Sequence, residues 1–100
     1  MSKSLDKNGY GPSILDTEVG YDYILKSYVG ITARHEIYFG TRNRSICKKY
    51  GFWVYVCPEI HAEIHKAGEL DERLKQECQE VFEQTHTRDE FMKLIGRNYL

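Results

Sequence analysis

Hydrophobic and polar positions divide the chain into short β-type runs followed by amphipathic helices. The clearest strand covers residues 52–57, an unbroken apolar, aromatic and β-branched run bounded by Gly51 and Pro58. Such a run predicts a largely buried strand. Residues 33–39 mix charged with apolar side chains and end before Gly40, which is typical of a strand running into a turn.

Two further segments have weaker patterns. Residues 21–31 are rich in Tyr, Ile, Val and Leu and end around Gly30, which predicts one or two short strands. Residues 41–51 are basic and loop-like, with room for one helical turn closed by Gly51. The segment therefore connects the two clearer strands without a predicted strand of its own.

The second half of the chain has helical periodicity. Pro58 suits the first position of a helix that runs to about Lys66, with Gly68 as its stop. From residue 69, apolar residues recur at spacings of three and four, which predicts an amphipathic helix of about four turns. These residues are Leu70, Leu74, Cys78, Val81 and Phe82. Thr87 and Glu90 form a capping-box pattern before a last short helix that ends near Gly96.

This order of elements predicts one α+β domain. We expect residues 1–12, with two glycines and a proline but no apolar periodicity, to be a flexible lead-in, and residues 13–100 to form the single domain. Its core motif would span residues 33–67 and its C-terminal helices residues 69–97. With 41% hydrophobic and 13% aromatic residues, the composition is that of a folded protein rather than a disordered one.

Composition also indicates the cellular compartment in which the protein acts. The longest uncharged apolar stretch is far shorter than the roughly 20 residues of a membrane-spanning helix, and the start lacks the apolar run of a secretory signal. Three cysteines without a CxxC pair favour reduced thiols over disulfides or a four-cysteine zinc site. We therefore expect no membrane association and a cytoplasmic location.

Candidate chemistry begins with three histidines. His61 and His65 are four residues apart in the predicted helix, so both lie on one face and could share a metal ion, although an isolated pair can equally be two surface histidines. His35 ends a predicted strand that would pair with residues 52–57, the strand leading directly into this helix. Three imidazoles with one open position suit a divalent ion that polarises a phosphate oxygen.

The distribution of charge along the chain indicates a second candidate for function, a basic segment. The net charge is only −1, but residues 34–66 carry six Lys and Arg against three Asp and Glu, whereas residues 67–100 carry five against eight. Within the basic middle lie Arg42, Arg44, Lys48 and Lys49. They form either a solvated loop or a phosphate-facing, nucleic-acid-binding surface.

The same segments resemble a known family. Residues 35–44, HEIYFGTRNR, and residues 49–61, KYGFWVYVCPEIH, together with His65, are similar to the HNH motif of phage-associated HNH nucleases. The resemblance covers roughly residues 13–100 and includes the ending from residue 90. It implies a ββα-metal (HNH-like) fold, a β-hairpin plus helix core, with additional C-terminal helices.

The resemblance also implies roles for individual residues. His35, His61 and His65 would bind the metal ion, and Asn43 would be the central asparagine that braces the hairpin loop. Where that family often has a second histidine as general base, this chain has Glu36. Glu36 could act as the base, bind the metal or pair with Arg34, and His35 itself could be the base if another group binds the metal.

The expected function is thus a metal-dependent HNH-type DNA endonuclease or nickase, encoded by a phage or mobile element and acting in the bacterial host cell. Its cofactor would be a divalent ion, Zn, Mg, Mn or Ni, and its partner double-stranded DNA. The alternative is a non-catalytic HNH-like module that binds DNA or a protein partner, as a recombination accessory or nuclease inhibitor. The oligomeric state has no signature in the sequence.

Overall fold

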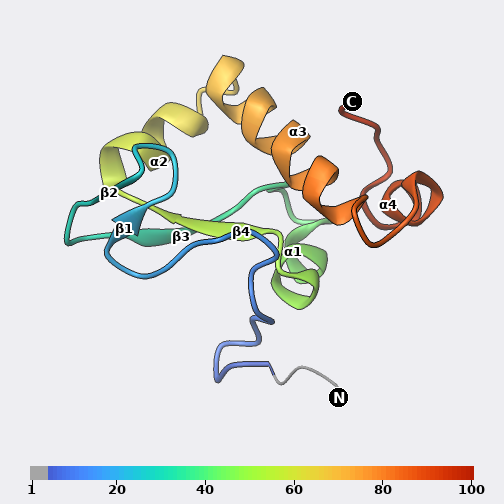
Figure 1. Cartoon of the computed structure of the whole chain (residues 1–100), viewed down its shortest axis with the longest axis horizontal. Coiled ribbons are helices and arrows are strands. Elements are labelled where there is room, and N and C mark those ends of the chain that lie inside the picture. Colours follow the sequence, from blue (N-terminus) through green and yellow to red (C-terminus); the bar gives the residue numbers. More distant parts are fainter. Residues whose placement is uncertain (1–4) are drawn as a thin grey trace.

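The β-prone runs form two antiparallel pairs in the computed structural model, which describes residues 5–100 (Figure 1). β1 (Tyr21–Asp22) pairs with β2 (Ser27–Tyr28), and β3 (Ala33–Glu36) pairs with β4 (Trp53–Val56). With four helices these strands make a small α+β domain. The strand predicted over residues 52–57 is observed as β4 over residues 53–56, and every side chain of the predicted run except that of Tyr55 is buried.

The β3 strand is shorter than predicted. The Ile37 N–H still donates to the Phe52 carbonyl at 2.9 Å, but the next residue turns away from the sheet. Tyr38 enters the core, where its hydroxyl donates to the backbone carbonyl of Lys75 at 2.6 Å. The apolar residues at the end of the run therefore fill the interior instead of extending the sheet.

The connection between β3 and β4 contains a helix where a loop with at most one turn was expected. α1 (Arg44–Tyr50) is seven residues long and buries the Cys47 side chain completely. Gly51 ends it in the left-handed conformation, with φ of 79°, and its N–H donates to the Cys47 carbonyl. The predicted end of the turn at Gly51 is thus confirmed. The buried Cys47 side chain holds the basic segment against the core as a helix.

The three later helices follow the predicted pattern. The bounds are α2 (Pro58–Ile64), α3 (Glu69–Phe82) and α4 (Arg88–Ile95). Thr87 and Glu90 make the predicted reciprocal capping box, and Gly96 ends α4 with φ of 86°. α2 stops slightly earlier than expected, so that His65 is its C-cap residue and not part of its last turn.

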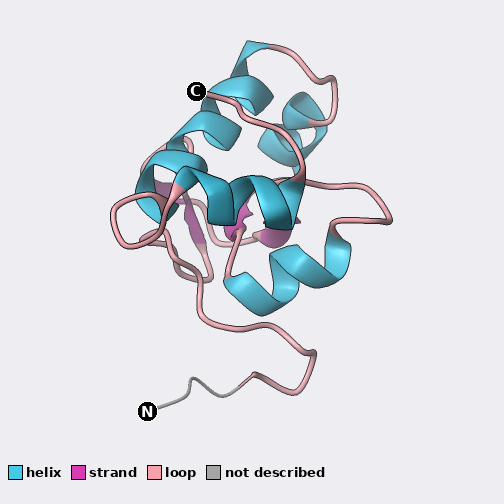
Figure 2. Cartoon of the chain, turned by 90° about the vertical axis from the view of Figure 1, so that its right-hand side faces the viewer, coloured by secondary structure: helices cyan, strands magenta, loops and turns pink. Residues whose placement is uncertain are grey.

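One core joins all these elements. In Figure 1 β3 and β4 lie between α3 on one side and α1 on the other, and Figure 2 shows the strands surrounded by helices. Aromatic rings meet edge to face at the centre, with Tyr38 contacting Phe52 and Phe91 at centroid distances of 5.6 and 5.4 Å. The largest fully buried apolar side chains are Tyr38, Phe52, Phe91, Ile37, Ile64, Val54 and Val56.

The segment before β1 lies against the β3–β4 hairpin. The Trp53 indole N–H donates to the Gly11 carbonyl at 2.9 Å, and Asp6 pairs with Arg34 at 2.8 Å. The Ser13 hydroxyl donates to the Trp53 carbonyl. Of the expected lead-in over residues 1–12, residues 1–4 lie outside the described part of the chain, and the remainder makes these contacts.

Gly51 gives a test of this packing. A Cβ atom there would lie 2.0 Å from the Pro12 carbonyl oxygen, and the positive φ angle is unfavourable for any other residue. We predict that Gly51→Ala lowers the free energy of unfolding by about 2–4 kcal/mol. Urea unfolding measures this loss. Gly68→Ala is the matched control, because a Cβ at Gly68 meets nothing within 4 Å; equal losses in both variants would contradict the account.

Candidate metal centre

His35 reaches the interior because of its place in the β3–β4 register. It pairs with Val54, and since side chains alternate along a strand, its ring shares the buried face with Val54 and Val56. Only 1% of the His35 surface is exposed. The Nε2 atom is buried and has no hydrogen-bond partner among residues 5–100. A buried polar nitrogen without a partner is costly, and a bound metal ion would satisfy it.

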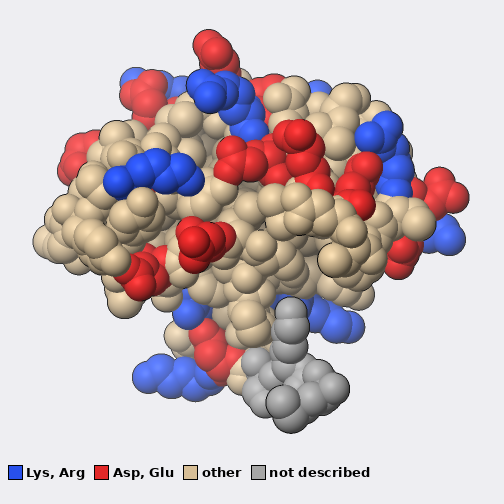
Figure 3. Space-filling view, viewed as in Figure 1, with Lys and Arg blue, Asp and Glu red and all other residues tan. Residues whose placement is uncertain are grey.

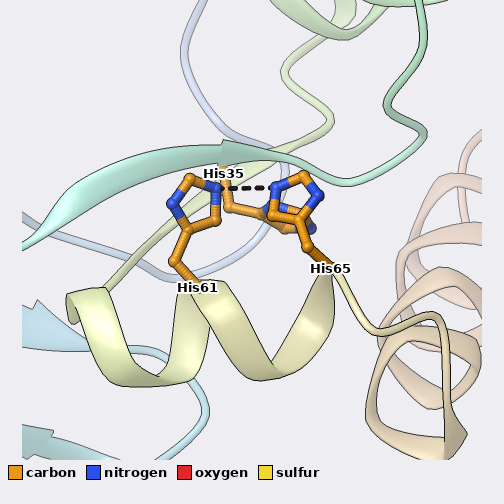
Figure 4. A group of neighbouring side chains, drawn as sticks. All are labelled: His35, His61 and His65. Atoms are coloured by element: carbon orange, nitrogen blue, oxygen red, sulfur yellow. Dashed lines mark hydrogen bonds between the residues drawn. The ribbon is translucent and has the colours of Figure 1, made fainter.

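α2 supplies the other two rings. Pro58 starts the helix one residue after Cys57, and the Cys57 N–H donates to a carboxylate oxygen of the fully buried Asp22 at 2.7 Å. Asp22 thereby connects the β1–β2 hairpin to the start of α2. His61 and His65 are one turn apart, with the His65 N–H bonded to the His61 carbonyl, so both rings project from the same face toward β3 (Figure 4).

The three rings lie close enough for one ion. The Nε2 atoms of His61 and His65 are 3.1 Å apart, and the centroid of the His35 ring lies 5.2 and 5.4 Å from those of the other two. One nitrogen from each ring lies within 4.8 Å of the others. Two nitrogens bound tetrahedrally to one zinc ion at about 2.0–2.1 Å stand about 3.3 Å apart. The cluster could therefore hold a metal ion, as the sequence predicted.

Burial favours the neutral form of His35 and His61, which is the form that binds metals. Burial lowers the pKa of His35 to about 3, and the neighbouring His61, His65 and Lys75 lower it further in the same direction. Burial and His65 also lower the pKa of His61, against an opposing effect of the Glu36 carboxylate. Burial decreases from His35 through His61 to the exposed His65, so the cluster runs from the core to the surface.

Glu36 follows His35 on β3, and strand alternation turns its side chain toward the other face. Its Oε2 accepts a hydrogen bond from the Tyr10 hydroxyl at 2.6 Å, and its Oε1 lies 3.6 Å from Nε of Arg44. Burial and Glu36 raise the pKa of Tyr10 to about 12, so the phenol remains a donor. Pairing with Arg34, one of the alternatives for Glu36, is not observed among the described residues, because that guanidinium pairs with Asp6.

Asn43 precedes α1 in the connection between the hairpin strands. Its backbone carbonyl accepts from the Cys47 N–H at 2.9 Å, but its side chain makes no capping hydrogen bond. The Oδ1 atom is buried without a partner in the described chain. The position in the loop is the expected one, whereas the side-chain bond that would brace the loop is not observed within residues 5–100.

The four basic residues of the predicted nucleic-acid-binding surface differ in their exposure and contacts. Arg44 and Lys48 are one turn apart on α1 and so share a face, and both Arg44 and Lys49 are exposed. Arg42 also lies at the surface, but it donates to the Ile95 carbonyl at the end of α4. Figure 3 shows acidic and basic side chains interspersed over the face it presents, without one extended basic area.

Three residues near the centre had no role in the sequence interpretation. The Asp22 Oδ1 accepts the N–H groups of Ile24 and Leu25 in an Asx turn. Because aspartate favours such turns, the sequence held a local indication of this role. Tyr10 and Lys75 had no such indication, because each meets the site only through the tertiary fold. Lys75 pairs with Asp71 at 3.0 Å and lies 4.6 Å from the centroid of the Phe39 ring, beside the histidines.

Comparison with known proteins adds no family assignment. None of the protein-family models, curated proteins and solved structures compared with the chain matches it. No helix within residues 5–100 combines the length and the apolar character needed to cross a bilayer.

Burial of neutral His35 predicts acid sensitivity of the metal-free protein. Below the ordinary pKa of 6.5 the unfolded chain takes up a proton that the folded ring refuses until about pH 3. Stability is therefore unaffected above pH 6.5 and falls as the pH drops toward 3, by up to about 1.4 kcal/mol per pH unit. Urea unfolding at pH 7 and pH 5 with a chelator measures the decrease. His35→Leu should reduce it and His86→Gln should not; an unchanged decrease in His35→Leu would contradict the assignment.

The cluster also predicts metal binding. Titration of the chelator-treated protein with Zn²⁺ or Ni²⁺ should give one site per chain by calorimetry and raise the melting temperature. His61→Ala and His65→Ala should weaken binding at least about tenfold, because each removes one of three nitrogen ligands. His86→Ala is the matched control, since His86 stacks on Phe82 away from the cluster. Unchanged binding in the first two variants would contradict the site.

Proposed function

We propose that this chain is a metal-dependent phosphodiester hydrolase acting on DNA, an endonuclease or nickase with an HNH-like ββα-metal centre. The observation that carries the proposal is the three-histidine cluster on a β-hairpin followed directly by a helix, with a buried His35 Nε2 that lacks a partner. A hairpin and helix that present three imidazoles and one open position suit metal-assisted hydrolysis.

In this proposal His35, His61 and His65 hold the ion. When bound, a divalent ion polarises a phosphate oxygen and stabilises the negative charge that develops on the leaving oxygen. The three rings contribute by converging on one point. Burial keeps His35 unprotonated throughout the physiological pH range, so acid would not displace the ion at this ligand until the fold itself is destabilised.

Glu36 is the proposed general base. Its carboxylate would accept a proton from the attacking water at Oε1 or Oε2. The Tyr10 hydroxyl donates to Oε2, and the Arg44 guanidinium lies 3.6 Å from Oε1, so both groups position the carboxylate. Arg44 and Lys48, on one face of α1, would contact phosphates of the DNA, with Arg42 and Lys49 on either side in the sequence.

One observation favours a second candidate, a non-catalytic module that binds DNA or a protein. Both Glu36 oxygens already have partners, and strand alternation directs the carboxylate away from His35. If that arrangement persists when DNA binds, no base reaches the phosphate, and the metal serves only to hold the hairpin to α2. The chain would then bind DNA without cleaving it.

The test is a nicking assay on supercoiled plasmid with Mg²⁺, Mn²⁺, Zn²⁺ and Ni²⁺ in turn and with a chelator. We predict metal-dependent conversion to the nicked form. His35→Ala and His61→Ala should abolish it, and Glu36→Gln should slow it about 10²–10⁴-fold. His86→Ala and Glu59→Gln are controls of the same chemical change outside the cluster.

Three outcomes decide between the candidates. Nicking that persists in His61→Ala contradicts the metal-dependent mechanism. Nicking by the wild type that is unaffected by Glu36→Gln removes Glu36 from the base role and leaves the nuclease proposal in place. DNA binding by mobility shift without nicking under any of the metals contradicts the nuclease proposal and supports the non-catalytic module.

A further inference from the structure

A hollow on the β1–β2 hairpin has the composition of a cation site. Its volume is about 490 Å³, and none of the three clustered histidines lines it. The lining residues are Asp16, Thr17, Glu18, Tyr21, Tyr23, Lys26 and Tyr28. Three tyrosine rings beside two carboxylates are the residue types that bind ammonium and guanidinium groups.

The geometry of the rings supports this assignment. Tyr21 and Tyr28 are directly paired across the hairpin, with centroids 4.9 Å apart and an interplanar angle of 67°. The third ring, that of Tyr23, is buried at the base of the hairpin and carries a cation already. The Nζ atom of Lys26 lies 3.5 Å from its centroid.

Lys26 thus occupies the position that an external cation would take. Its side chain is exposed and forms no ion pair among residues 5–100, so the Tyr23 ring is the contact that holds its ammonium group. Its backbone has φ of 58°, a left-handed conformation that lysine rarely adopts. The backbone N–H of Lys26 donates to the Asp22 carbonyl at 2.8 Å, whereas its exposed ammonium group rests on the Tyr23 ring, where a cation from outside can replace it.

Carboxylates surround the rings. The Tyr28 hydroxyl donates to Glu18, which raises the pKa of that phenol. The Tyr23 hydroxyl donates to Glu77, and burial together with this carboxylate raises the pKa of Tyr23. The hydroxyl groups are thus occupied in hydrogen bonds, while the ring faces remain for a cation. With Asp16 also in the lining, the negative charge exceeds that of Lys26 and favours a positively charged ligand.

The apolar side chains around the hollow indicate that its ligand is a polypeptide and not a small free amine. Exposed apolar side chains gather on this hairpin and at its ends, and an exposed apolar patch beside a polar site marks an interaction surface. They are Val19, Leu25, Tyr28, Val29 and Ile31, with exposures of 69%, 51%, 73%, 38% and 76%. In a partner polypeptide, Ala and Val side chains next to a basic residue would bury this apolar surface, whereas a free amine would leave it exposed to water.

We propose that this hollow binds an Arg or Lys side chain of a partner polypeptide. The partner's cation takes the place of Lys26 Nζ against the tyrosine rings, and its apolar neighbours pack on Val19 and Ile31. The site is independent of the histidine cluster and holds whether or not the chain cleaves DNA.

The test is an NMR titration of the full chain with a blocked pentapeptide that has arginine in the centre and valines on both sides. Saturable shifts of the Tyr21, Tyr23 and Tyr28 resonances are expected. The same peptide with a central glutamine should bind at least about threefold more weakly. Absence of shifts at the three tyrosines overturns the proposal, and so does equal binding of the glutamine peptide. Equal affinity for ethylammonium overturns the assignment to a polypeptide.

Two variants separate cation binding in the hollow from general charge effects. Tyr28→Leu keeps an apolar side chain at an exposed position and should weaken peptide binding about threefold to tenfold. Lys26→Gly removes the internal cation, is compatible with the positive φ angle, and should tighten binding. Lys7→Gly makes the same change in net charge away from the hollow. If Lys7→Gly tightens binding as much as Lys26→Gly, only net charge acts and the proposal is wrong.

Discussion

The antiparallel register of β3 against β4 determines which side chains of these strands enter the core and which face outward. His35 pairs with Val54 and so enters the interior, while Arg34 and Glu36 lie on the opposite face. A slip of one residue would exchange the two faces, placing a guanidinium in the core and His35 in solvent. Because α2 begins directly after β4, the same register also sets the distance from His35 to His61 and His65.

The two faces of β3 have different chemistry as a result. On the buried face, desolvation keeps His35 neutral and leaves its Nε2 without a partner, which is tolerable for a metal ligand and costly otherwise. On the outer face, Arg34 lies over the rings of Tyr10 and Trp53 at 4.2 and 4.5 Å and pairs with Asp6. The strand therefore separates a potential metal centre from an aromatic and ionic cluster that holds residues 5–12 in place.

A second connection joins the β1–β2 hairpin to this centre. Burial raises the pKa of Asp22, but the N–H groups of Cys57, Leu25 and Ile24 outweigh that effect and the net pKa is lowered. Since the ionised carboxylate accepts from the residue that begins α2, it fixes the helix that carries His61. The same hairpin exposes Leu25, Tyr28 and Val29 at the surface, so one small element combines an internal anchor with an exposed face.

The sequence by itself determined the elements whose signals are local: the buried run ending in Pro58, the spacing of Leu74, Cys78 and Phe82, and the Thr87 capping box. It also indicated the three histidines, because the order of hairpin and helix places them together. The tertiary structure decided what depends on distant partners. Burial of Cys47 converts the basic loop into α1, and Tyr10 reaches Glu36 across 26 residues. Such contacts leave no periodic pattern in the sequence, so only the packed fold shows which side chains are partners.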